Sequence, residues 1–219
     1  MARALPAERS EAMTARLDHT VTSGTFSLDG GTWDVENNVW VIGDESQCVV
    51  IDAPHSVEPI VELIGDRRLL AVLCTHAHDD HVTVAGELSD RYDAPVMLHP
   101  ADDPLWRMTY RHAAFEPLAD GQIVEVGGTA LHVLHTPGHS PGAVCFYAPG
   151  LGALFSGDTL FQGGPGATGR SYSDYDTIIA SIRDRLLTLP PETVVHTGHG
   201  PDTTIGGEAA QAESWTRPG

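Results

Sequence analysis

Two kinds of stretch alternate in the pattern of apolar and polar positions along this chain. Short apolar runs, which predict buried strands, cover residues 38–42, 48–52, 69–75, 95–99, 122–126, 129–136, 143–148, 153–156 and a segment from Thr193. Apolar residues at helical spacing predict helices over 57–64, 82–92 and 175–189, and 101–113 predicts a helical insert. Asp174 can cap the 175–189 helix and Pro190-Pro191 ends it. The pattern alone therefore predicts an α/β or α+β fold.

The length and the two ends of the chain indicate one domain. At 219 residues the chain is large enough for one domain with a proper core. We expect residues 1–20 to form an N-terminal extension, frayed or disordered, and residues 21–219 to form the domain. The N-terminal segment lacks a signal-peptide pattern, and no run approaches 18 apolar residues, so no membrane partner is expected.

Charge and cysteine usage narrow the class of protein further. Twelve Arg and no Lys stand against 30 acidic residues, which gives a net charge of −18. Nucleic-acid binding needs cations that displace phosphate counterions, so a nucleic-acid partner is not expected. Cys48, Cys74 and Cys145 each lie in an apolar run, which favours burial as small hydrophobes. Their odd number suits a reducing compartment, and we expect a cytoplasmic protein.

The strongest chemical signal is the segment Thr75-His-Ala-His-Asp-Asp-His81, which directly follows an apolar run. Folding alone does not favour three imidazoles and a carboxylate crowded together, because such groups are costly to bury unpaired. Neutral imidazole and carboxylate are the ligands of Zn²⁺ and of non-haem iron. The segment therefore predicts a metal site at the carboxyl end of a strand.

Three more metal-competent side chains follow predicted strands. His139 stands in Pro137-Gly-His-Ser after one strand, Asp158 in Gly157-Asp-Thr after another, and His199 in Gly198-His-Gly after a third. One such histidine is usually an ordinary loop residue. Four strand ends that all carry ligand-type residues indicate a common site.

These motifs resemble those of the metallo-β-lactamase superfamily, in order and spacing. The matching segments are T75-H-A-H-D-D-H81, T136-P-G-H-S140, S156-G-D-T-L160 and T197-G-H-G200, preceded by V49-V-I-D52. The resemblance runs from about Phe26 to Glu208. It implies an α+β fold, the αβ/βα four-layer sandwich, in which two mixed sheets face each other beneath outer helices.

The resemblance also implies roles for individual residues. His76, His78 and His139 would bind a first metal, and Asp80, His81 and His199 a second. Asp158 would bridge the two metals, and Asp52 would hold the histidine loop from behind. The alternative for Asp52 is an ordinary strand-ending turn residue. Zn²⁺ is the first expectation for both metals, with Fe or Mn compatible.

Within the superfamily the chain looks most like the short, single-domain bacterial relatives of glyoxalase II. Asp158 stands where β-lactam-cleaving members carry Cys or Ser, so β-lactam cleavage is disfavoured. The expected activity is hydrolysis of a small-molecule thioester by a hydroxide between the metals, which Asp80 also orients. The alternatives are a mononuclear iron persulfide dioxygenase and a lactonase of the same fold. A monomer or homodimer is expected.

Substrate recognition is less clearly marked. Arg170 follows Asp158 in a glycine-rich segment and is the candidate for a substrate carboxylate, with Tyr172 and Tyr175 on the same wall. The alternative for Arg170 is a surface arginine. In full-length glyoxalase II, which this chain resembles, basic residues of a helical C-terminal domain hold glutathione. The present chain ends 20 residues after His199 and has no lysine. The hypothesis is therefore a thiol other than glutathione, such as mycothiol.

Two groups of residues are expected to be structural. Trp106 and Tyr110 in the helical insert either cover the site or pack in the core, and we favour packing. Seven further histidines are expected to be structural or at the surface: His19, His55, His99, His112, His132, His135 and His196.

Overall fold

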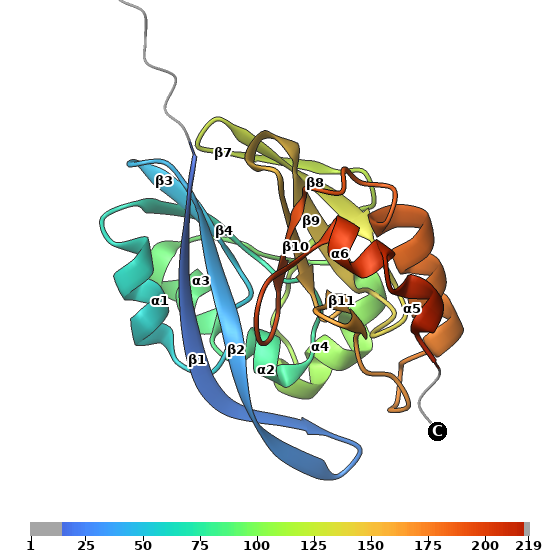
Figure 1. The fold of residues 1–219 in the computed structure, drawn as a ribbon. Helices are drawn as coiled ribbons and strands as arrows, with labels where there is room; N and C mark the ends of the chain where they lie inside the picture. The colour runs from blue at the N-terminus through green and yellow to red at the C-terminus, as the bar shows by residue number, and fades with distance from the viewer. Residues whose placement is uncertain (1–14, 217–219) are drawn as a thin grey trace, which may run out of the picture.

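Two six-stranded sheets face each other in the computed structural model, which describes residues 15–216 (Figure 1). The first sheet has the order β1-β2-β3-β4-β5-β6. Its strands are β1 (Arg16–Leu28), β2 (Gly31–Gly43), β3 (Gln47–Ile51), β4 (Arg68–Leu73), β5 (Val96–Leu98) and β6 (Glu116–Pro117). β1 and β2 are antiparallel to each other, as are β2 and β3, whereas β3, β4, β5 and β6 run parallel.

The second sheet has the order β14-β13-β10-β9-β8-β7. Its strands are β7 (Ile123–Val126), β8 (Thr129–His135), β9 (Val144–Ala148), β10 (Ala153–Gly157), β13 (Val194–Thr197) and β14 (Thr203–Thr204). Only β10 and β13 are parallel to each other. A short hairpin of β11 (Leu160–Phe161) and β12 (Gly164–Pro165) leaves the end of β10.

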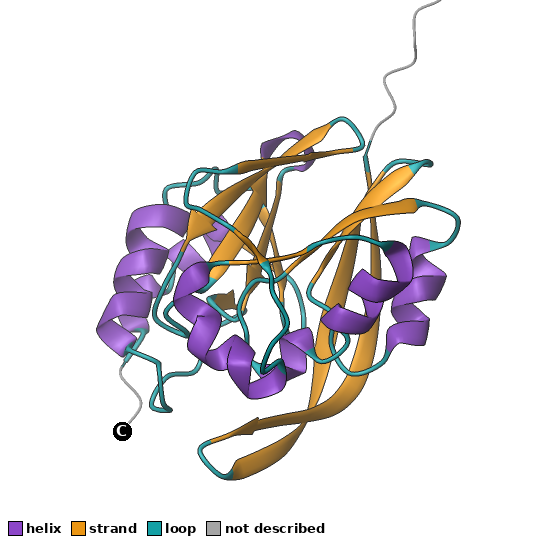
Figure 2. Cartoon of the chain, turned by 180° about the vertical axis from the view of Figure 1, so that it is seen from behind, coloured by secondary structure: helices purple, strands orange, loops and turns teal. Residues whose placement is uncertain are grey.

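Helices cover the outer face of each sheet (Figure 2). The first sheet is covered by α1 (Val57–Ile64), α3 (Ala85–Tyr92) and α4 (Asp103–Thr109), which follows a 3₁₀ turn at Pro100–Asp102. The second is covered by α5 (Tyr175–Ser181), which continues as a π-helix over Ile182–Leu186, and by α6 (Ile205–Ala209). Short 3₁₀ turns lie at Pro149–Leu151 and Ala212–Ser214.

Successive side chains of a strand point to opposite faces of its sheet, so the two sheets have three apolar layers. One layer lies between the sheets, and one lies beneath the helices on each outer face. Val49 and Ile51 of β3 face the second sheet, where they join Phe146 and Phe155 in the central layer. Val50, between them in sequence, faces the helices on the other side. The predicted four-layer αβ/βα sandwich is therefore confirmed. Among the described residues, no helix has the length and apolar character of a membrane span.

The structure corrects several predicted elements near the N-terminus. β1 begins at Arg16, so residues 16–20 of the predicted extension belong to the first sheet, while residues 1–14 lie outside the described residues. The apolar-run pattern missed β1 and the first half of β2, because their outward positions are polar and half of each ribbon is exposed. The predicted extent of α1 is confirmed.

Two predicted helices differ from the structure in their extent. The helix predicted over 82–92 is divided into α2 (Asp79–Val82) and α3, because Val84 leaves the helical backbone region with ψ at 13°. Asp80 and His81 are therefore in a helical turn. The helix predicted over 175–189 ends at Leu186 after widening into the π-helix. Asp174 caps α5 as predicted, since its Oδ1 accepts the Thr177 N–H at 2.7 Å.

Candidate metal centre

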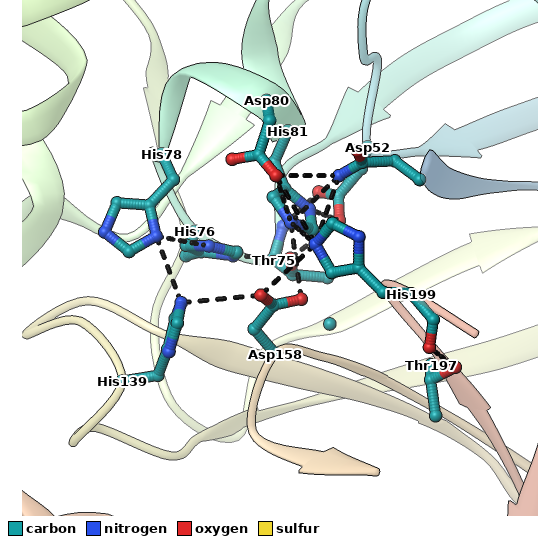
Figure 3. Close-up of polar contacts among 12 residues, drawn as sticks. Asp52, Thr75, His76, His78, Asp80, His81, His139, Asp158, Thr197 and His199 are labelled. Atoms are coloured by element: carbon teal, nitrogen blue, oxygen red, sulfur yellow. Dashed lines mark hydrogen bonds and ion pairs between the residues drawn. The ribbon is translucent and has the colours of Figure 1, made fainter. Parts of the chain in front are cut away.

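All seven predicted metal ligands converge at one edge of the two sheets (Figure 3). Two of them follow β4, two lie in α2, one follows β8, one follows β10 and one follows β13: His76 and His78, Asp80 and His81, His139, Asp158, and His199. Four separate segments of the chain thus supply the side chains, because His76 to His81 form one of them, and the facing sheets hold those segments in place.

The first group consists of His76, His78 and His139. His78 Nδ1 lies 3.0 Å from His76 Nε2 and 3.0 Å from His139 Nε2. Burial lowers the pKa of His76 well below its ordinary value and that of His78 to about 3, so both rings are neutral. Three converging ring nitrogens cannot satisfy one another as hydrogen-bond partners. Tetrahedral ligands of Zn²⁺ lie about 3.3 Å apart, so this group fits a cation.

The second group consists of Asp80, His81 and His199. His199 Nε2 lies 3.3 Å from both His81 Nε2 and Asp80 Oδ2, and the His81–Asp80 distance is 3.7 Å. Burial acts to lower the pKa of His81, but the carboxylates of Asp158, Asp80 and Asp52 outweigh it and hold that pKa well above its usual range. The same balance raises the pKa of His199 to about 10, with Asp158 the main opposing charge. The group therefore attracts positive charge strongly.

Asp158 lies between the two groups. Its Oδ2 is 3.5 Å from His139 Nε2 and 3.4 Å from His199 Nε2, and its Oδ1 is 3.3 Å from His81 Nε2. Burial acts to raise the pKa of Asp158, but His199 and His81 outweigh it and hold the pKa well below its usual range. Oδ1 is buried and forms no hydrogen bond with a described residue. An ionised carboxylate whose two oxygens face both groups suits a bridge between two cations.

Four of the five histidines in the two groups are held from behind through the outer ring nitrogen. The partners are Thr75 Oγ1 for His76 (3.1 Å), Asp52 Oδ2 for His81 (2.8 Å), Ala167 O for His139 (2.8 Å) and Glu36 O for His199 (2.7 Å). Such partners fix the tautomer that presents a lone pair to a metal. His78 Nε2 is buried and has no partner among the described residues.

Asp52 acts both as a turn residue and as a support. Its φ of 58° lies in the left-handed region, as expected where a strand turns sharply. The carboxylate also accepts hydrogen bonds from Thr75 N and Thr75 Oγ1, each at 2.7 Å, besides its contact with His81. The two interpretations considered from the sequence are therefore compatible with each other.

Asp102 is a buried residue near the site that sequence reasoning missed. Its Oδ2 accepts hydrogen bonds from Ala77 N at 2.9 Å and Ser140 Oγ at 2.8 Å, and its Oδ1 accepts one from Gly142 N at 2.5 Å. Asp102 therefore ties the segment that carries His76 and His78 to the segment that carries His139. No local pattern marks it, because it precedes α4 far along the chain from both partners.

Asn37 and His55 were also missed. Asn37 is fully buried in β2, and its Nδ2 lies 3.0 Å from Asp80 Oδ2, while its Oδ1 lies 2.7 Å from His55 Nε2. His55, expected to be structural or at the surface, contacts Asn37 and is thereby linked to the second group. The available signal was the amide pair Asn37-Asn38 at the start of a buried strand, where polar groups are costly.

Of the predicted substrate residues, the two tyrosines line two different clefts. The Arg170 guanidinium stacks 4.1 Å from the Trp33 ring and 5.3 Å from the Phe26 ring. Tyr172, with a left-handed φ of 70°, lines a cleft of about 470 Å³ beside the tip of the β1–β2 hairpin. Tyr175 lines another, of about 450 Å³, near the β11–β12 hairpin. The two tyrosines do not share the expected wall, because the chain reverses at Tyr172.

A smaller cleft of about 220 Å³ touches His78 directly, and Leu28, Leu105 and Met108 form its apolar walls. Trp106, by contrast, is buried and donates from Nε1 to Ala113 O, and the Tyr110 hydroxyl donates to Val82 O. The packing interpretation of these two residues is therefore supported.

The three cysteines are fully buried, as predicted. Burial raises the pKa of Cys48 and of Cys145 to about 11, and raises that of Cys74 as well. Thiols in this state do not act as metal-binding thiolates at neutral pH.

Comparison with known proteins agrees with the motifs. The family model described as "Metallo-beta-lactamase superfamily" matches residues 32–199. The "Probable metallo-hydrolase YqgX" of Bacillus subtilis is 34% identical over 188 residues, which cover 78% of this chain and 88% of the relative. The "Hydroxyacylglutathione hydrolase GloC" of Haemophilus influenzae is 34% identical over 181 residues, 75% of this chain and 85% of the relative.

Among solved structures, TTHA1623 in a di-iron-bound form superimposes with a TM-score of 0.71 at 39% identity. The match covers 80% of this chain and 93% of that chain. A two-metal centre is thus present in a protein similar to this one.

Proposed function

Since the chain is a metallo-hydrolase of the metallo-beta-lactamase superfamily, we propose that it cleaves thioesters of a low-molecular-weight thiol at a dinuclear metal centre. The observation that carries the proposal is Asp158, whose two oxygens face the two groups of candidate ligands. The family resemblance implies an aspartate at this position in members that hydrolyse thioesters, lactones and phosphodiesters, and a Cys or Ser in those that cleave β-lactams. Among these hydrolases, similarity to the hydroxyacylglutathione hydrolase GloC supports a thioesterase.

Two divalent cations bound in this site would polarise the thioester carbonyl and lower the pKa of a water held between them. His76, His78, His139, Asp80, His81, His199 and Asp158 would hold the cations. Asp80 directs Oδ2 toward His199 and Asn37. Its other oxygen forms no hydrogen bond with a described residue and is available to orient the attacking water. A thiolate leaves readily because its conjugate acid has a pKa of only about 8.5, so no dedicated general acid is needed.

Arg170 would recognise an anionic part of the substrate. Its guanidinium forms no ion pair with a described carboxylate and is held by the stack on Trp33 and Phe26. The Phe26 ring in turn lies 5.0 Å from the His78 ring, so a single side chain separates the guanidinium from the metal centre. A planar guanidinium with free edges suits a carboxylate, which it binds through two parallel hydrogen bonds.

A comparison of substrates tests the proposal. Purified protein is given lactoyl thioesters of glutathione and of mycothiol, an uncharged thioester, an acyl-homoserine lactone and a chromogenic β-lactam. We expect turnover of a charged lactoyl thioester to exceed that of every non-thioester substrate. Lactone turnover at least as fast would contradict the proposal, and so would oxygen uptake with an organic persulfide in the absence of hydrolysis.

A further inference from the structure

The second group of ligands has a fourth polar neighbour that the family motifs do not include. Asn37 lies on β2, far in sequence from α2 and from the segment after β13, and its side chain is fully buried. Its Nδ2 lies 3.0 Å from Asp80 Oδ2, 3.3 Å from His81 Nε2 and 3.4 Å from His199 Nε2. One end of the carboxamide thus touches all three members of the second group.

These four atoms form the corners of a tetrahedron. The three edges among Asp80, His81 and His199 measure 3.3, 3.3 and 3.7 Å, close to the three edges that lead to Asn37. The centre of a tetrahedron with edges of about 3.3 Å lies about 2.0 Å from each corner, which is a normal Zn–N or Zn–O bond length. Asn37 therefore occupies the position of a ligand, and a residue that merely supported a ligand would lie further from the centre.

The carboxamide can present oxygen at that corner. A half-turn about the last side-chain bond exchanges Oδ1 and Nδ2 with almost no change of shape. The turn removes an N–H group that would face a cation. His55 Nε2, now 2.7 Å from Oδ1, would then accept the amide N–H, as a neutral imidazole does in the tautomer that carries its proton on Nδ1.

We propose that Asn37 is a further ligand of the second metal, bound through its side-chain oxygen and held in that orientation by His55. Asp80, His81, His199 and Asn37 then surround the second metal, and Asp158 lies between this group and the first one. Oxygen from an amide is a neutral ligand, so Asn37 adds a bond without adding to the negative charge of the site. The proposal needs only the metal centre and is independent of which substrate is cleaved.

The test is titration of metal-free protein with Co²⁺, followed by the visible absorption of the bound ion and by competition with a chelator. Asn37→Leu preserves the side-chain shape and removes the oxygen, whereas Asn37→Asp keeps an oxygen in place. We expect the Leu variant to lose about 10- to 100-fold in affinity for the second Co²⁺, with an altered spectrum and an unchanged first site. The Asp variant should bind the second Co²⁺ at least as tightly as the parent.

Asp34→Asn is the matched control, because it changes an exposed side chain three positions away on the same strand and should leave both affinities unchanged. Parental affinity and spectrum in the Leu variant would overturn the proposal. Loss of the second Co²⁺ in the Asp variant would also overturn it, because a residue that only donates a hydrogen bond to Asp80 cannot be replaced by a carboxylate. Neither result depends on turnover, so the proposed thioesterase activity is tested separately.

Discussion

Asp102→Asn should loosen the connection between the two segments that supply the first metal group. The wild-type carboxylate accepts hydrogen bonds from Ala77 N, Ser140 Oγ and Gly142 N. An amide has one acceptor oxygen, so its nitrogen must face either Gly142 N or the other two donors. In the less costly orientation one backbone N–H loses a bond to a charged acceptor, which costs about 1.5–3 kcal/mol.

One effect opposes this loss. Burial raises the pKa of Asp102 despite the hydrogen bonds it accepts, so the folded protein bears a cost for keeping this carboxylate ionised. The neutral amide removes that cost. We therefore expect metal-free Asp102→Asn to lose about 2 kcal/mol of unfolding free energy, with Tm lower by about 4–8 °C.

The assay is urea unfolding of the metal-free variant, together with metal titration of the folded protein. Affinity for the first metal should fall more than affinity for the second, because Asp102 contacts only segments that carry His76, His78 and His139. Asp103→Asn is the control: Asp103 is only half-buried, and its ion pair with Arg107 contributes at most about 1 kcal/mol. Parental stability and parental affinity for both metals in Asp102→Asn would show that this carboxylate does not hold the two segments together.

Three further substitutions test other parts of the site. Arg170→Leu should raise KM for a carboxylate-bearing thioester about tenfold with kcat nearly unchanged, as measured by steady-state kinetics. Arg183→Gln, at an exposed position on the π-helix, is the control and should change neither constant. Equal effects on an uncharged thioester would contradict the role of Arg170 in binding a carboxylate. Asp158→Ala should abolish hydrolysis and reduce bound metal to one ion per chain or fewer, as measured by elemental analysis; full metal occupancy would show that Asp158 is not a bridge. Asp52→Asn should weaken binding of the second metal about 10- to 100-fold, because His81 loses its charged partner; unchanged affinity by chelator competition would contradict this.

The candidate metal ligands could be predicted from the sequence because each stands directly after an apolar run. The segment from Thr75 to His81 is dense enough to be recognised alone, and His139, Asp158 and His199 repeat the same local pattern. Strand ends at one edge of an α/β sheet meet in space, so the local pattern carries long-range information.

The supporting residues could not be predicted in the same way. Asp102 contacts Ala77 and Gly142, which are distant in sequence, and its own surroundings in the chain resemble an ordinary helix start. β1 was missed for a related reason. It pairs with β2 along its whole length, but its alternating polar positions give no apolar run. A residue or strand whose role depends on contacts with distant parts of the chain leaves only a weak pattern in its own stretch of sequence.

Elemental analysis of the purified protein, combined with thioester hydrolysis before chelation, after chelation and after metal is restored, shows whether a two-metal centre performs the hydrolysis. We expect about two metal ions per chain, loss of hydrolysis on chelation and its recovery with Zn²⁺, Fe²⁺ or Mn²⁺. Hydrolysis that survives complete metal removal would contradict this expectation, as would one iron per chain with oxygen uptake in place of hydrolysis.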